Sequence, residues 1–225
     1  RVNLVIRQVG YSPNISARRL IRNKSYMVCI LMYPGFDQPA AALLPRLMDI
    51  GYDENYDILV QPYFPALSRS KNKLVEMISE KRIDGFVTTP PTDADGFVTD
   101  LLTTYKVPFV QIDPFEPSET IPYVAGDDFQ GAYAMTEYLA GLNHRRIAFL
   151  LGPRNLRSSR DRFQGYQAAL AAHGTPTDER LIEPSEFTFD GGYTATRLLF
   201  QREPKPQAIF AGNDTAAYGA LFAAM

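Results

Sequence analysis

Two arginines in the middle of this 225-residue sequence stand where a predicted strand passes into a predicted helix, a position at which they could bind a ligand. Arg160 and Arg162 follow the apolar run 146–152 after the loop "GPRNLRSS", and they open a helical pattern. A guanidinium is a planar fork that can hold a carboxylate or a pair of hydroxyl groups. The alternative is an ordinary surface arginine or a salt bridge, and residue type alone leaves both readings open.

Two further polar residues stand directly after apolar runs. Asp113 follows "VPFVQI" and precedes Pro114, so it either forms a turn or accepts hydrogen bonds from ligand hydroxyls. Asn213 and Asp214 stand where an apolar run passes into a helical pattern. Asp214 is well placed to cap that helix, which leaves Asn213 as a possible ligand donor.

Two other polar groups have a structural explanation that we favour. The acidic pair Asp127 and Asp128 could bind a metal or act in acid–base chemistry, but it precedes a predicted helix at 129–142 and fits the capping role better. The segment "NHRR" at 143–146 could bind phosphate. We favour a helix end, at which Asn143 adopts the left-handed conformation that glycine usually takes.

Composition removes several classes of function. The two histidines lie far apart and Cys29 is the only cysteine, so we expect no metal site and no internal disulfide, and we expect a reducing cytoplasm. No Walker loop, G-x-S-x-G or dinucleotide fingerprint is present, so we expect no cofactor. No apolar run approaches the roughly 20 residues of a membrane-spanning helix. Without a paired acid and base or a nucleophile at the strand ends, an enzyme is the weaker interpretation.

Short apolar runs alternate with helical patterns from residue 27 onward, which predicts βαβ units in an α/β fold with parallel sheets covered on both faces. Pro45 should kink or end the first helix. The predicted strands are 27–32, 56–63, 83–89, 107–113, 146–152 and 208–212. The predicted helices are 39–51, 70–82, 95–106, 129–142, 160–174, 191–201 and 214–224. Ligands of such folds bind beyond the carboxyl ends of the strands, where the sequence places Tyr33, Thr89, Asp113, Gly152, Phe187 and Asn213.

The net charge of −2 conceals an uneven distribution. Residues 1–26 carry six basic residues and no acidic one, whereas the remainder holds 17 basic and all 25 acidic residues. This distribution indicates that the basic residues 1–26 bind a polyanion and that the acidic remainder of the chain does not.

Seven segments in order resemble the LacI/GalR family of bacterial transcription regulators. They are "GYSPNISARRL" (10–20), "KRIDGFV" (81–87), "VPFVQID" (107–113), "NHRRIAFLLGP" (143–153), "SSRDRFQGYQAAL" (158–170), "FDGGYTATRLL" (189–199) and "PQAIFAGNDTAAYGAL" (206–221). The resemblance implies two periplasmic-binding-protein-like subdomains with a small effector in the cleft, preceded by a helix-turn-helix head and a hinge helix. We therefore expect the end of the head and the hinge at 1–26, one subdomain at 27–126, and a second at 127–225 that is incomplete because the sequence reads as a fragment.

The resemblance also implies functional residues. Residues 33–58 depart from the family pattern, which weakens the transfer of Tyr33. In the hinge, a leucine of the family wedges between base steps of the minor groove, and that leucine is Leu20 here. The implied effector contacts are Arg162, Asp113, Asn213, Phe187, Arg160 and Tyr33. The implied DNA contacts are Asn14, Ser16, Ala17, Arg18, Leu20 and Arg22.

The preferred interpretation is a cytoplasmic, homodimeric repressor that binds operator DNA and responds to a sugar or sugar derivative. A periplasmic sugar-binding protein for transport shares the fold and is the first alternative, although a hinge and a basic segment like residues 1–26 are not expected in it. An enzyme on the same scaffold is the second alternative, because fold does not fix function.

Leu20 provides a direct test of the hinge. We expect Leu20→Ala to weaken specific DNA binding and to leave effector affinity unchanged, because an apolar wedge kinks the duplex and widens the protein contact. Fluorescence anisotropy with operator-like DNA and the full-length protein measures the first quantity, and calorimetric titration with effector measures the second. Equal operator affinity of variant and parent contradicts the assignment.

Overall fold

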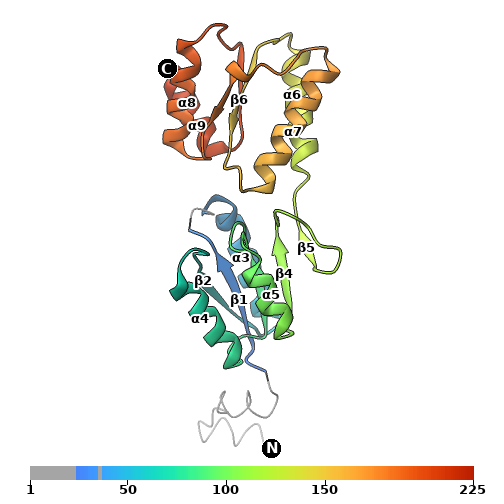
Figure 1. Cartoon of the computed structure of the whole chain (residues 1–225), viewed down its shortest axis with the longest axis vertical. Helices are drawn as coiled ribbons and strands as arrows, with labels where there is room; N and C mark the ends of the chain where they lie inside the picture. The colour runs from blue at the N-terminus through green and yellow to red at the C-terminus, as the bar shows by residue number, and fades with distance from the viewer. Residues whose placement is uncertain (1–23, 35–36) are drawn as a thin grey trace, which may run out of the picture. The chain divides into compact units, whose positions relative to one another are not determined.

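The structure, a computed structural model, describes residues 24–34 and 37–225, with residues 37–41 described by their backbone alone (Figure 1). All six predicted DNA contacts, from Asn14 to Arg22, lie outside the described residues. The chain divides into two compact units. The first ends at Ile112 and also takes in Thr120–Pro122, whereas the second comprises Asp113–Glu119 and Tyr123–Met225. The domain bounds expected from the sequence stay a prediction.

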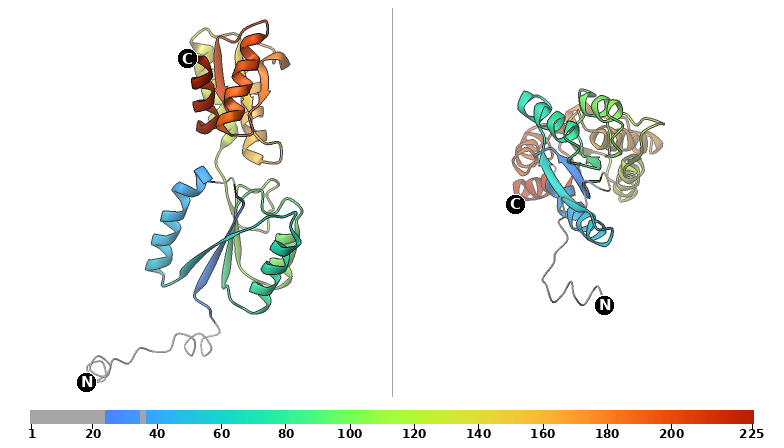
Figure 2. Two further views of the ribbon diagram at one scale, coloured as in Figure 1. Left: turned by 90° about the vertical axis from the view of Figure 1, so that its left-hand side faces the viewer. Right: turned by 90° about the horizontal axis from the view of Figure 1, so that it is seen from below.

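The first unit is built around a mainly parallel sheet with the strand order β2-β1-β3-β4-β5. β1 pairs in parallel with β2 and β3, and β3 pairs in parallel with β4. Helix α3 lies on one side of this sheet, and α4 and α5 lie on the other (Figure 2). The elements of this unit are β1 (Met27–Met32), α3 (Asp37–Asp53), β2 (Asp57–Pro62), α4 (Ser68–Ser79), β3 (Gly85–Thr88), α5 (Phe97–Thr104) and β4 (Phe109–Ile112). The short edge strand β5 (Tyr123–Val124) pairs with this sheet, although the division of the chain assigns its two residues to the second unit.

The core of the first unit fills the space between the sheet and α4 and α5. Cys29 and Leu31 of β1 are fully buried there, because alternate residues of a strand face the same side. Burial raises the pKa of the Cys29 thiol to about 12, so the thiol stays protonated and acts as a small apolar group. The helices contribute Leu74, Met77, Ile78, Val98 and Leu102 to the same cluster.

Helix α3 runs through Pro45 to Asp53, so the proline does not end the helix. A proline within a helix removes one backbone hydrogen bond and crowds the preceding turn. Of the two outcomes expected from the sequence, an end of the helix at Pro45 is therefore wrong, whereas a kink there stays a prediction.

The second unit has a three-stranded parallel sheet with the order β7-β6-β8. Helices α6 and α7 pack together on one face, and α8 and α9 pack together on the other (Figure 1). The elements are α6 (Asp128–Gly141), β6 (Ile147–Leu151), α7 (Arg157–Ala172), the 3₁₀ helix η1 (Glu179–Leu181), β7 (Ile182–Pro184), α8 (Phe189–Gln201), β8 (Ala208–Ala211) and α9 (Asp214–Ala224).

The central strand β6 is buried on both faces. Ile147 and Phe149 join the cluster under α6 and α7, whereas Ala148 and Leu150 join the cluster under α8 and α9. This explains why the strand reads as a continuous apolar run. The position of its carboxyl end, at Leu151, is fixed by packing on both sides.

The α/β class with parallel sheets is confirmed, and each predicted strand and helix is present with ends shifted by a few residues. β5, β7 and η1 were not predicted, because each has only two or three residues and none forms an apolar run. Within 24–34 and 37–225, no helix has the length and apolar character needed to cross a membrane.

The close packing of α6 on α7 gives a test of the second unit. A Cβ added at Gly165 would lie 2.2 Å from the Phe129 carbonyl oxygen and 2.9 Å from the Tyr133 backbone nitrogen. Because both neighbours are backbone atoms, we expect Gly165→Ala to destabilise the protein by about 1–3 kcal/mol, as measured by equilibrium urea unfolding.

Gly131→Ala on α6 is the matched control. An added Cβ there meets no atom within 4 Å, and alanine favours a helix over glycine by about 0.5–1 kcal/mol. Equal unfolding midpoints for the two variants contradict the close helix contact.

Candidate functional site

The carboxyl end of the second unit's sheet is covered by one aromatic ring. The Phe187 ring lies directly over Gly152, which follows β6, and over Gly212, which follows β8. A Cβ would approach a ring atom to 2.1 Å at Gly152 and 2.6 Å at Gly212. Glycine is therefore required at both strand ends for the ring to lie there, and Phe187 forms an apolar floor at this edge.

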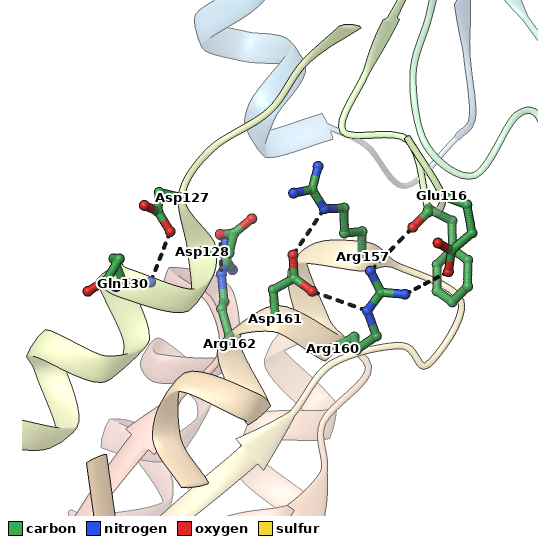
Figure 3. Close-up of polar contacts among 9 residues, drawn as sticks. Glu116, Asp127, Asp128, Gln130, Arg157, Arg160, Asp161 and Arg162 are labelled. Atoms are coloured by element: carbon green, nitrogen blue, oxygen red, sulfur yellow. Dashed lines mark hydrogen bonds and ion pairs between the residues drawn. The ribbon is translucent and has the colours of Figure 1, made fainter. Parts of the chain in front are cut away.

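Arg162 of α7 reaches this edge and contacts three other segments, and its pairing with Asp128 is drawn in Figure 3. Its Nε and Nη2 both lie 2.8 Å from Oδ1 of Asp128, at the start of α6. Its Nη1 donates to the carbonyl oxygen of Gly212, and its guanidinium lies 5.7 Å from the centroid of the Phe187 ring. The side chain is 30% exposed, so it is both anchored and accessible.

The acidic pair before α6 divides its roles. Asp127 is the N-cap, and its carboxylate accepts a hydrogen bond of 3.1 Å from the Gln130 backbone nitrogen, as predicted (Figure 3). Asp128 is not a cap but the ion-pair partner of Arg162. The expectation that both carboxylates cap the helix is therefore wrong for Asp128, since the helix starts one residue earlier than predicted.

Asn213, rather than Asp214, caps α9. The Asn213 Oδ1 accepts from the Ala216 backbone nitrogen at 2.9 Å, and its Nδ2 donates to the Phe187 carbonyl oxygen at 3.0 Å. The expected cap at Asp214 is wrong by one residue. Asn213 thereby ties the end of β8 to the loop after β7, and it lies next to the Arg162 contact at Gly212.

Three residues of this region have left-handed backbones. Glu186 and Phe187 have φ of 51° and 56°, and Asp113 has φ of 46°. Such conformations are uncommon for residues other than glycine and persist only where the surrounding structure fixes them. The surrounding structure therefore fixes the backbone of the loop after β7 and of the start of the segment 113–119, and with it the direction in which their side chains leave the backbone.

Asp113 belongs to the second unit. Its backbone nitrogen donates to the Val124 carbonyl oxygen at 2.8 Å. Its Oδ1 is buried and has no hydrogen-bond partner within the described part of the chain. A buried polar atom without a partner costs about 1–3 kcal/mol, so the position of Asp113 lowers the free energy of unfolding.

The charges around Asp113 act in opposite directions. Burial is the main cause that raises the pKa of the Asp113 carboxyl, and the negative charge of Asp128 raises it further. Arg157, Arg162 and a hydrogen bond from Ser158 oppose this and lower the pKa, without cancelling the effect of burial. Asp113 and the two arginines are thus electrostatic neighbours.

Arg160 is held away from Arg162 by its own partners (Figure 3). Its Nη1 lies 2.8 Å from Glu116 Oε1, its Nε donates to Asp161 at 3.1 Å, and its guanidinium lies 4.9 Å from the centroid of the Phe115 ring. Arg160 therefore clamps the segment 113–119 to α7.

Sequence reasoning missed Arg157, the first residue of α7. Its Nε donates to Asp161 at 3.0 Å, and its guanidinium lies 6.0 Å from the Tyr123 ring centroid. Its Nη1 is buried without a partner among the residues described. The spacing of Arg157 and Asp161 is that of an i,i+4 helical pair, but the predicted helix began at residue 160 and left Arg157 in the loop.

The other predicted residues lie in the first unit or do not reach the edge. The Tyr33 ring is 6.1 Å from the Phe64 ring, both in the first unit. At "NHRR", Asn143 has a left-handed backbone as predicted, and Arg145 Nη1 lies 3.4 Å from the His173 carbonyl oxygen at the end of α7. Among the described residues, no group of three or more His, Cys, Asp or Glu side chains could hold a metal ion.

Two α/β units with parallel sheets, one of which carries an arginine network at its carboxyl edge, define a periplasmic-binding-protein-like protein. Residues 66–225 match the family described as "Periplasmic binding proteins and sugar binding domain of LacI family". The chain belongs to this family, and the resemblance read from the sequence is confirmed.

Named relatives agree with this assignment. The HTH-type transcriptional regulator CelR of Thermobifida fusca is 30% identical over 229 residues, which cover 98% of this chain and 66% of that protein. The ribose operon repressor of Escherichia coli (strain K12) is 27% identical over 222 residues, with 97% and 66% covered. A solved structure, the "transcriptional regulator CelR-cellobiose complex", has a TM-score of 0.78 at 25% identity and covers 99% of this chain and 67% of that one. The chain thus spans about two thirds of the length of these curated relatives.

The left-handed backbone of Asp113 and its buried Oδ1, which has no partner among the described residues, lead to a stability prediction. A carboxyl whose pKa is raised in the folded protein favours folding at low pH, and this contribution is lost as the pH rises through the folded pKa. We therefore expect Asp113→Asn to raise the Tm of the ligand-free protein by about 2 °C at pH 7, because asparagine tolerates the left-handed backbone and carries no charge.

The pH dependence is the control. Below the ordinary pKa range of aspartate, both the folded and the unfolded parent are protonated at this position, so the gain should shrink. Calorimetric scans at pH 7 and pH 3 measure it. A Tm lowered at pH 7 contradicts the account of Asp113.

Proposed function

We propose that the protein is a DNA-binding transcriptional regulator, specifically a repressor whose operator affinity is controlled by a sugar-like effector. Membership of the family and the regulators among its relatives support this proposal. One relative is named for the ribose operon and another is solved with cellobiose. The role proposed here is binding rather than catalysis.

The observation that carries the proposal is the anchored but accessible Arg162. A guanidinium has five N–H donors. The contacts to Asp128 and Gly212 use three of them among the described residues. One donor on each Nη is thus available, and this pair matches two hydroxyl groups of a sugar.

The neighbouring residues complement this pair of donors. Asp113 accepts hydrogen bonds from ligand hydroxyls, Phe187 offers an apolar ring face to the sugar ring, and Asn213 fixes the loop that carries Phe187. Arg160 and Tyr33 remain proposed contacts on the resemblance alone, since Arg160 is held by Glu116 and Asp161.

Three further features belong to the same proposal. Asn14, Ser16, Ala17, Arg18, Leu20 and Arg22 contact operator DNA, and the positive charge of residues 1–26 supports this. The DNA-binding form is a homodimer, because two hinge helices related by a two-fold axis read a near-palindromic site. Regulators of transcription act where the DNA is, so we place the protein in the cytoplasm.

Arg162→Ala tests the effector site. We expect effector affinity to fall about ten- to a hundredfold, which corresponds to the roughly 1.5–3 kcal/mol of a charged hydrogen bond. Operator affinity without effector should remain within about twofold of the parent, because Arg162 lies outside the DNA-binding segment. Calorimetric titration with the sugar that gives the largest thermal shift, and anisotropy with operator DNA, measure the two affinities.

Arg162→Lys separates charge from fork geometry in this test. It keeps the charge beside Asp128 but cannot present two parallel donors, so it should regain fold stability without regaining full effector affinity. Effector affinity within twofold of the parent in Arg162→Ala shows that the site assignment is wrong.

A further inference from the structure

Two buried polar atoms of the second unit lack partners within the described residues, and they are complementary. One is Oδ1 of Asp113, an acceptor, and the other is Nη1 of Arg157, a donor. The two side chains are close enough for the Arg157 charge to act on the Asp113 carboxyl. Neither atom has a hydrogen-bond partner within the described residues, so a ligand group that satisfied both would accept from Arg157 and donate to Asp113.

A hydroxyl group meets this requirement, because it donates one hydrogen bond and accepts others. A carboxylate or a phosphate only accepts at neutral pH. It could pair with Arg157, but it would place a second negative charge against Asp113. Hydrogen-bond type and charge therefore both favour an uncharged ligand.

The charges of the half-buried network lead to the same conclusion. Its three arginines are matched by three aspartates, so no positive charge remains to bind an anion. The network consists of Arg157, Arg160, Arg162, Asp113, Asp128 and Asp161. The exposed neighbours Arg154, Glu116 and Glu186 add no positive surplus.

We infer that Arg157 is a specificity-determining residue which, together with Asp113, selects a neutral polyhydroxylated ligand and rejects acidic and phosphorylated sugars. This inference rests on the proposed effector function and narrows its ligand class. The cluster of arginines is then a positioning device: Asp161 holds Arg157 and Arg160, and Asp128 holds Arg162.

Matched pairs of neutral and anionic sugars test the ligand class. Calorimetric titration of the full chain compares glucose with glucuronate and glucose 6-phosphate, galactose with galacturonate, and ribose with ribose 5-phosphate. We expect the neutral member of any pair that binds to have at least about tenfold higher affinity than its anionic partner. An anionic member that binds equally or more tightly overturns the inference and leaves the proposed function intact. No binding by any member contradicts the proposed function, and the inference fails with it.

Two substitutions of opposite charge test the residues. Arg157→Met makes the network more negative. It should therefore lower the affinity for the neutral sugar about tenfold and lower the affinity for the anionic sugar by more than that. Asp113→Asn makes the network more positive. It should therefore lower the affinity for the neutral sugar and shift the ratio of the two affinities about tenfold toward the anionic sugar. A purely structural role would not move the selectivity ratio in opposite directions.

Two more variants serve as controls. Arg157→Lys keeps the charge and loses the fork, so it should retain the selectivity ratio at reduced affinity. Arg197→Met makes the same kind of replacement on the exposed side of α8 and should change neither quantity. Selectivity that shifts in the same direction in Arg157→Met and Asp113→Asn overturns the assignment of Arg157.

Discussion

The ion pair between Arg162 and Asp128 is the interaction on which the arrangement of the second unit's edge depends. It joins residues 34 positions apart in sequence, at 2.8 Å, and links the starts of α6 and α7. The same guanidinium binds the carbonyl oxygen of Gly212 and lies beside the Phe187 ring. Removal of one partner from a partly buried pair leaves an uncompensated charge, so loss of either residue would weaken the link between these four segments.

At this edge of the sheet, tight packing fixes the strand ends, whereas some of the proposed ligand-binding residues have unfavourable conformations or surroundings. Packing on both faces of β6 fixes the strand ends, and the glycines at 152 and 212 admit the Phe187 ring. The left-handed backbone at Phe187 and the buried Oδ1 of Asp113, which has no partner among the described residues, oppose folding. Such unfavourable features are common in binding sites, because a site whose side chains are already in place loses less conformational entropy when the ligand binds.

The sequence predicts the parts of this account that depend on local pattern. Continuous apolar runs identify β4, β6 and β8, and the segments that follow these strands contain Asp113, Arg162 and Asn213 respectively. Asn213 and Asp214 are both good caps, so local chemistry could not decide between them. Asp128 and Arg157 were missed as ion-pair partners because their roles depend on contacts that only the tertiary fold creates. β7 was missed because three residues carry too little pattern.

The most direct measurement is amide hydrogen exchange by mass spectrometry, with and without a sugar that raises the Tm. We expect added protection at three separate backbone stretches of the second unit. These stretches are 157–162, 185–188 and 212–216, because all three converge on Arg162 and Phe187. The exposed end of α9, with Leu221 and Phe222, should not change. Protection confined to α9, or absent from all three stretches while the Tm rises, contradicts the placement of the effector site at this edge.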